Sequence, residues 1–154
     1  MLLGVSEPTD PLAVEAQVCL TVSAAARSLV AFYRPLLEPL GLTHPQYLAM
    51  LALWQYGALS LKDLAALLHL EPATTSPLVK RLEAMGLVRR ERDPHDDRAL
   101  LIALTSAGRD LRAQAVGIPA SMVDGLGLER AEIEQIRAAA ELLYRASTRA
   151  AAGA

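Results

Sequence analysis

The 154-residue chain has very little cysteine, few aromatic residues and no long hydrophobic run. Its single cysteine, Cys19, cannot form an intrachain disulfide, and one cysteine with three scattered histidines offers no ligand set for structural zinc. Aromatic residues make up only 4% of the chain, so its core must be built from leucine, alanine, valine and isoleucine. Glycine-rich phosphate loops and HExxH, CxxC or GxSxG patterns are also missing. We therefore expect no metal, no cofactor and no enzyme activity.

Two further absences concern membranes and charge. The longest uncharged apolar stretch near the start, Val18 to Ala26, is too short to cross a bilayer, and the first residues lack the basic region of a signal peptide. We therefore expect a cytoplasmic protein. Neither sign of charge dominates, because 15 basic and 17 acidic residues give a formal net charge of −2. That balance alone does not suggest a nucleic-acid partner.

What the chain does have is helical periodicity with clear start and stop signals. Apolar residues recur at steps of three and four. They predict four helices over about 12–37, 46–56, 61–68 and 72–85. Pro35 should kink or shift the last turn of the first helix, which Gly41 ends. Thr43 and Gln46 form a capping box for the second helix, and Gly86 follows the fourth. The third and fourth helices, joined by a tight turn, make a helix-turn-helix candidate.

A hairpin is predicted directly after this helical pair. Strand-like runs over 87–92 and 99–104 flank a polar loop over 93–98, and such a hairpin forms a wing. Further along we expect a fifth helix over about 105–123, which breaks near Gly117 and Pro119. A turn at Gly125 and Gly127 should follow it. The chain should end with a last helix over about 129–148 and a frayed tail over 150–154.

The predicted fold is mainly α with a small β-hairpin wing, a winged helix-turn-helix dimerised through its N- and C-terminal helices. Long amphipathic helices at both ends carry apolar stripes that no other module covers, and a second subunit can bury them. We expect residues 1–154 to form one subunit. Within it, about 43–108 would be a DNA-binding lobe, and about 12–40 and 109–148 would be dimerisation helices.

The signal for nucleic acid lies in where the charges sit. Five basic against two acidic residues give the segment 80–92 a net charge of +3. The first turn of the fourth helix adds small hydroxyl residues and a helix N-terminus, and Arg98 in the wing suits a narrow minor groove. The candidate DNA-binding residues are Thr74, Thr75, Ser76, Lys80, Arg81, Arg90 and Arg98. A solvated, salt-bridged surface would show the same charges, but the wing with its arginine favours double-stranded DNA as a partner.

Three stretches are distinctive when taken together: LKDLA at 61–65, LVKRLEAMGLV at 78–88, and DDR at 96–98 followed by LTSAG at 104–108. They resemble the multiple-antibiotic-resistance regulator (MarR) family of winged-helix dimeric repressors. The resemblance implies a homodimer on a pseudo-palindromic operator. It also implies a wing Asp-x-Arg pair that holds an arginine in the minor groove, which maps to Asp96 and Arg98.

Within that family the chain resembles the organic hydroperoxide resistance regulators, through residues 16–19, 33–37, 43–54 and 75–81. The resemblance implies a repressor that senses organic hydroperoxides by oxidation of one cysteine in the first helix, here Cys19, and then releases its operator. Members surround that thiol with tyrosine hydroxyls, of which Tyr33 matches one. Ser23 and His44 stand where members often have tyrosine. His44 could hydrogen-bond the sulfur or, when protonated, stabilise a thiolate.

Spacing constrains how this site is assembled. Cys19 and Tyr33 share a helix face but are separated by 14 residues, about 21 Å at the helical rise, so one helix cannot bring them together. Two-fold pairing of first helices would place Cys19 against Tyr33 of the partner subunit, while Ser23 reaches Cys19 within its own helix. Without a second cysteine, a sulfenic acid would be trapped by a small thiol.

Three interpretations stay open from the sequence. The first is the hydroperoxide-sensing repressor. The second is a repressor of the same fold that binds an apolar or phenolic ligand, with Cys19 packing as a plain buried cysteine. The third is a thiol peroxidase, against which the lack of a resolving cysteine argues.

Overall fold

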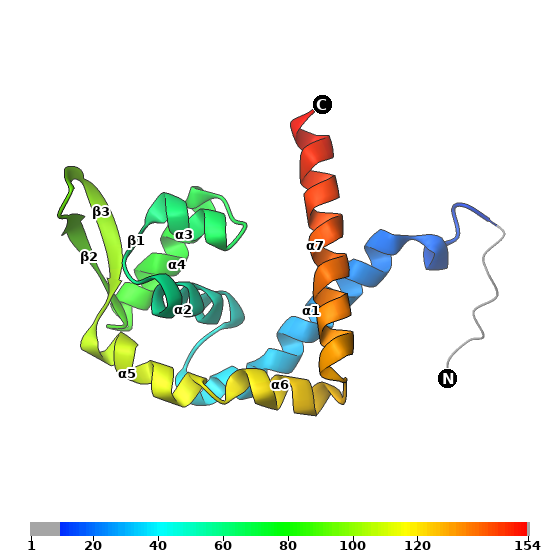
Figure 1. The fold of residues 1–154 in the computed structure, drawn as a ribbon, viewed down its shortest axis with the longest axis horizontal. Helices are drawn as coiled ribbons and strands as arrows, with labels where there is room; N and C mark the ends of the chain where they lie inside the picture. The colour runs from blue at the N-terminus through cyan, green and yellow to red at the C-terminus, as the bar shows by residue number, and fades with distance from the viewer. Residues whose placement is uncertain (1–9, 154) are drawn as a thin grey trace. The chain divides into compact units, whose positions relative to one another are not determined.

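The computed structural model describes residues 10–153, apart from the side chains of residues 15, 97 and 98. The chain divides into two compact units, with the boundary after Ala113. The first unit contains five helices and three strands among the described residues, and the second continues from the last residues of α5 into α6 and α7 (Figure 1). No helix in the described range combines the length and apolar character needed to cross a membrane.

The first unit begins with a short 3₁₀ turn, Val14–Ala16, and the long helix α1, Val18–Leu37. Pro35 lies in the last turn of α1, which ends two residues later and continues as a 3₁₀ turn, Glu38–Leu40. Gly41 then adopts a left-handed conformation with φ 67°. The predicted stop at Gly41 is confirmed, and the kink or shift expected at Pro35 stays a prediction.

Helix α2, His44–Tyr56, forms the centre of the first unit. Its capping box is present: the backbone N–H of Thr43 donates to Oε1 of Gln46 at 2.8 Å. Because α2 is apolar nearly all round, most of its length is buried. Its buried residues are Gln46, Tyr47, Ala49, Met50, Ala52 and Leu53.

The helix-turn-helix consists of α3, Leu61–Leu67, and α4, Pro72–Ala84. The Ser60 hydroxyl caps α3 by accepting from the backbone N–H of Asp63 at 3.0 Å. His69 turns the chain between the helices with φ 55°, and Gly86 leaves α4 with φ 74°. The two helices contact each other and, with α2, lie beside a small sheet (Figure 1). The predicted helix-turn-helix is therefore present.

The sheet has three antiparallel strands in the order β1-β3-β2. Strands β2, Val88–Asp93, and β3, Asp96–Leu104, form the predicted wing. Sequence analysis missed β1, Leu59–Ser60, because a two-residue strand exists only through its pairing with Ile102 and Leu101 of β3.

The expected polar loop over 93–98 is too long. The structure keeps only Pro94 and His95 between the strands, because the Asp93 side chain accepts from the backbone N–H of His95 at 2.8 Å and closes a tight turn. The pairing of β2 with β3 shifts between Arg92 and Asp93, so the tip of the wing carries an irregularity.

The remaining helices are α5, Ser106–Ala115, α6, Ile118–Leu126, and α7, Arg130–Ala152. The expected break near Gly117 and the turn at Gly127, with φ 64°, are confirmed. Gly125 is not part of that turn: it lies in the last turn of α6, since the left-handed step falls on Gly127 alone. The tail is not frayed from residue 150, because α7 continues to Ala152.

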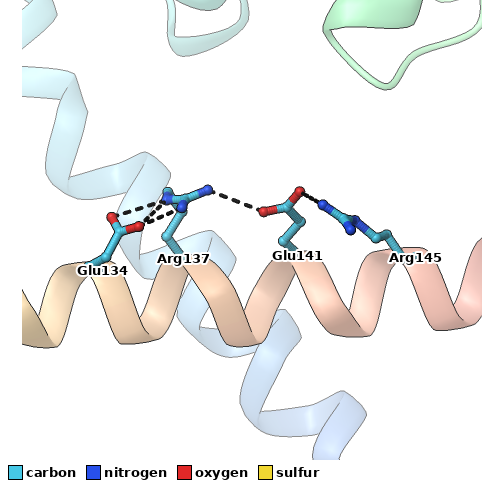
Figure 2. Close-up of polar contacts among 4 residues, drawn as sticks. All are labelled: Glu134, Arg137, Glu141 and Arg145. Carbon is cyan, nitrogen blue, oxygen red and sulfur yellow. Dashed lines mark hydrogen bonds and ion pairs between the residues drawn. The ribbon is translucent and has the colours of Figure 1, made fainter.

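One side of α7 carries a continuous row of opposite charges (Figure 2). Arg137 pairs with Glu134 one turn before it and with Glu141 one turn after it, and Glu141 also accepts from Arg145. The same helix exposes large apolar side chains and buries none of its residues. The exposed ones are Ile136, Leu142, Leu143 and Tyr144. A helix with this division of polar and apolar residues is typical of an interface.

Candidate functional site

The single cysteine lies in the first turn of α1 and is exposed. Ser23, one turn later, is exposed as well. Several apolar residues of the same helix are also uncovered: Val18, Leu20, Val22, Leu29 and Val30. Within one subunit Cys19 is therefore uncovered, together with the apolar residues around it.

Tyr33 and His44 lie side by side at the other end of α1. Their ring centroids are 5.0 Å apart, and the ring of Tyr47 lies 6.0 Å from that of Tyr33. Tyr33 comes from α1, whereas His44 and Tyr47 come from the first turn of α2, which the Thr43 cap positions. Helical spacing marks Tyr47 only as a core residue. Its meeting with Tyr33 depends on how two helices cross and has no local signal in the sequence.

Burial controls the protonation of these three rings. It raises the pKa of Tyr33 above its ordinary value of 10.0 and lowers the pKa of His44 below 6.5. Burial, and then the neighbouring Tyr33, raises the pKa of Tyr47. Near neutral pH the phenols keep their protons and the imidazole is uncharged, so each ring can donate a hydrogen bond. The expectation of a protonated His44 is therefore disfavoured, and its role as a neutral donor is favoured.

The structure brings Tyr33 together with His44 and places Ser23 one helical turn after Cys19, but it does not bring these two pairs together. Cys19 and Tyr33 are 14 positions apart on one continuous helix, which separates them by about 21 Å along α1. A site that combines the thiol with the phenol thus needs a second copy of α1.

A pocket of about 580 Å³ adjoins the ring cluster. It lies where the end of α1 meets the start of α2. Its lining residues are Val30, Arg34, Glu38, Gly41, Leu42, Thr43, His44 and Pro45. An apolar wall with a few polar groups is typical of a small-molecule site.

The candidate DNA-contacting residues of α4 are not all on the surface. Thr74, Lys80 and Arg81 are exposed, and Ser76 is half-buried. Thr75 is 0% exposed, and its hydroxyl donates to the carbonyl of Glu71 at 3.0 Å. Thr75 therefore belongs to the packed face of α4 and does not reach the surface. Its position could have been found from its spacing, since Thr75 shares a helix face with Leu78, Val79 and Leu82, which are all buried.

The wing carries the remaining candidates. Arg90 pairs with Glu83 of α4 at 3.5 Å, and both side chains stay partly exposed. Asp96 is exposed at the start of β3. Arg98 falls within the bounds of β3, and its side chain lies outside the described part of the structure. At the base of the wing, the guanidinium groups of Arg89 and Arg109 both donate to the carbonyl of Leu104, each at 3.0 Å.

Comparison with known proteins places these features in a family. The sequence model of the MarR family matches residues 42–100, the segment from α2 into the wing. The organic hydroperoxide resistance transcriptional regulator of Bacillus subtilis is 38% identical over 135 residues, which cover 88% of this chain and 90% of that protein.

Two solved structures are similar over nearly the whole chain. Reduced AbfR bound to DNA, a protein of Staphylococcus epidermidis, is 29% identical with a TM-score of 0.74, covering 88% of this chain and 93% of that one. BpsR of Bordetella bronchiseptica, whose DNA binding is regulated by 6-hydroxynicotinic acid, is 29% identical with a TM-score of 0.76. The similarity covers 90% of this chain and 98% of that one. On this sequence identity and coverage, and with the winged helix-turn-helix present, the chain belongs to the MarR family of transcriptional regulators.

Proposed function

We propose that this regulator represses transcription as a homodimer on a pseudo-palindromic operator, and that oxidation of Cys19 by an organic hydroperoxide releases the DNA. The observation that carries the proposal is the exposed thiol of α1 in a chain 38% identical to a regulator of organic hydroperoxide resistance. Residues 43–108 would act as the DNA-binding lobe, and residues 12–40 and 109–148 as the dimerisation helices.

For DNA, the proposal assigns α4 to the major groove and the wing to the minor groove. Thr74 and Ser76 at the start of α4 would contact phosphates or base edges, and Lys80, Arg81 and Arg90 would contact phosphates. Arg98, oriented by Asp96, would enter the narrow minor groove. The exposure of Thr74, Lys80 and Arg81 supports this assignment. Thr75 is no longer a candidate for DNA contact, because it is buried.

For the dimer, the proposal pairs the uncovered apolar residues of α1 and α7 with those of a second subunit. Val18, beside Cys19, is 64% exposed, and Ile136 is 56% exposed in α7. Two-fold pairing would place Cys19 near Tyr33 and His44 of the partner subunit. This arrangement accounts for a thiol and a group of donors that a single chain keeps apart.

The reaction would proceed by attack of the Cys19 thiolate on the terminal oxygen of the hydroperoxide. The S–O bond forms as the O–O bond breaks, sulfur loses two electrons, and the departing alkoxide takes a proton to become an alcohol. Ser23, Tyr33 and neutral His44 would donate hydrogen bonds to the thiolate or to the departing oxygen. A small thiol would then condense with the sulfenic acid to give a mixed disulfide and water.

The decisive experiment measures operator binding by fluorescence anisotropy with and without cumene hydroperoxide, for the wild type and Cys19→Ser. Mass spectrometry of the Cys19 peptide reports oxidation in the same samples. We expect the reduced wild type and the variant to bind equally, and only the wild type to dissociate. Retention of DNA by fully oxidised wild type would contradict the proposal.

The pocket beside His44 favours a second candidate, release by a non-covalent apolar or phenolic ligand. BpsR, with its 6-hydroxynicotinic acid, gives a precedent within the fold. In that case Cys19→Ser would respond to the inducer as the wild type does. A thiol peroxidase would instead consume hydroperoxide catalytically when a reductant is supplied, and oxidation of one equivalent only would exclude this alternative.

A further inference from the structure

The first turn of α5 touches the chain that leaves α4. A Cβ atom built on Gly108 would lie 2.0 Å from the backbone oxygen of Leu87 and 3.2 Å from Cδ2 of Leu104. Leu87 comes one residue after the turn at Gly86 that ends α4. Only a residue without a side chain permits this approach, so the α5 backbone rests directly on the end of α4.

Thr105 ties the same two segments by hydrogen bonds. Its hydroxyl donates to the carbonyl of Gly86 at 2.6 Å and accepts from the backbone N–H of Gly108 at 3.1 Å. Its own backbone N–H donates to the carbonyl of Leu87 at 3.0 Å. One residue therefore caps α5 and binds it to the turn after α4.

Trp54 fixes the same turn of α5 to the core. Its indole Nε1 donates to the carbonyl of Gly108 at 2.8 Å, across 54 residues of sequence. Trp54 lies in α2, most of which is buried, and the adjacent Leu53 is 1% exposed. The start of α5 is thus bound to both α2 and α4.

The far end of α5 is open by comparison. Val116 is 65% exposed, and among the described residues no atom outside the local chain lies within 4 Å of the Cβ position of Gly117. The chain reaches α6 and α7 only through α5.

We propose that Trp54, Thr105 and Gly108 form a latch that makes α5 and α4 move as one piece, so that a displacement of α5 on oxidation of Cys19 reorients α4. This inference rests on the proposed function. Trp54 is the positioning residue, because its N–H holds the carbonyl of Gly108 without taking part in DNA binding or in the thiol chemistry.

The test compares operator affinity before and after full oxidation of Cys19. Wild type should lose affinity by about fivefold or more, the scale at which such couplings usually start. Trp54→Phe keeps a ring but removes the donor. It should bind normally when reduced and oxidise at the wild-type rate, while its ratio of reduced to oxidised affinity falls towards one. Tyr56→Phe, at the exposed end of the same helix, should keep the wild-type ratio.

A second pair of variants covers the case in which Trp54→Phe does not fold. Thr105→Val removes the hydroxyl and should reduce the ratio of reduced to oxidised operator affinity. Thr105→Ser keeps the hydroxyl and should show the wild-type ratio. A wild-type ratio in both Trp54→Phe and Thr105→Val would overturn the latch while leaving the proposed function intact. If the oxidised wild type itself holds DNA, the proposed function fails and the latch falls with it.

Fluorescence gives an independent readout, because Trp54 is the only tryptophan in the sequence. If the latch moves as one piece, the Trp54 emission maximum of the wild type stays the same on oxidation. A red shift would mean that the indole gains water as α5 separates from α2, and it would overturn the inference.

Discussion

Single residues would set the chemistry of the proposed sensor, and His44 shows this most clearly. Resemblance to hydroperoxide regulators predicts a hydroxyl at this position, and the chain has an imidazole. Because burial lowers the pKa of His44, the ring is a neutral donor that mimics a tyrosine hydroxyl. The contact with Tyr33 then joins two donors into one unit. In the proposed site, histidine in place of tyrosine would therefore keep a hydrogen-bond donor without adding a charge.

Stability should depend on pH through His44. Its folded pKa lies below the ordinary value of 6.5, so above that pH the residue is neutral in both folded and unfolded chains and its contribution is complete. As the pH falls below 6.5 the unfolded chain binds the proton first, and stability is lost down to the folded pKa. Urea denaturation between about pH 7.5 and about pH 5.5 should show a smaller loss for His44→Gln than for the wild type.

The matched control for this prediction is His95→Gln, at an exposed residue in the turn of the wing. It should keep the wild-type dependence on pH. Equal pH dependence of His44→Gln and the wild type would contradict the assignment.

Tyr33→Phe should bind DNA normally and oxidise more slowly. A hydrogen bond to a charged group contributes about 1.5 kcal/mol or more, which corresponds to a rate about tenfold lower if the donor acts in the transition state. Mass spectrometry of the Cys19 peptide over time measures the rate, with Tyr56→Phe as the control. An unchanged rate would remove Tyr33 from the site.

Secondary-structure elements are the level at which the sequence is most informative. Helix boundaries near Thr43, Gln46, Gly41 and Gly86 agree with prediction to within a few residues, because these residues act locally. Where no such signal stands the prediction was wrong: α1 begins at Val18, six residues after the expected start. Long-range contacts could not be foreseen in the same way. Strand β1, the hydrogen bond from Trp54 to Gly108 and the meeting of Tyr33 with Tyr47 all depend on the packed fold. The candidate site was therefore predicted as a set of residues rather than as an arrangement.

Helix α4 and the wing should make separable contributions to DNA binding. Lys80→Ala should lower affinity for all operators alike and reduce the salt dependence by about one released counterion per subunit. Arg98→Ala should lower affinity and also weaken the preference for A·T-rich flanks, and Asp96→Ala should do so more mildly. Anisotropy on operators that differ only in their flanks separates the effects. Unchanged affinity of Arg98→Ala would remove the wing from the interface.

The molecule as a whole is incomplete as a single chain. Both α1 and α7 leave large apolar side chains uncovered. The row of ion pairs on α7 adds little to the stability of the fold, because its charges are exposed to solvent (Figure 2). A second subunit would cover the apolar residues and assemble the sensor. The same contacts that stabilise the protein would then also position the thiol.

Light scattering should therefore find a dimer at micromolar concentration. Ile136→Glu places a charge in the proposed interface and should raise the dimer dissociation constant at least tenfold, since burying such a side chain is worth about 1.5–3 kcal/mol on each subunit. Gln135→Glu, at the neighbouring exposed position, adds the same charge and should leave the dimer intact. A stable wild-type monomer would contradict this prediction.

The carbonyl of Leu104, which accepts from both Arg89 and Arg109, also bears on how such a regulator can diverge. Arg89 joins the two wing strands at their root, Arg109 joins that root to α5, and the shift in pairing after Arg92 separates the root from the tip. Pro94 and His95 lie outside both strands, so their side chains can change without altering the strand pairing. If the wing contacts DNA as proposed, gene duplication followed by changes at this tip would give related regulators with different operators and the same sensor.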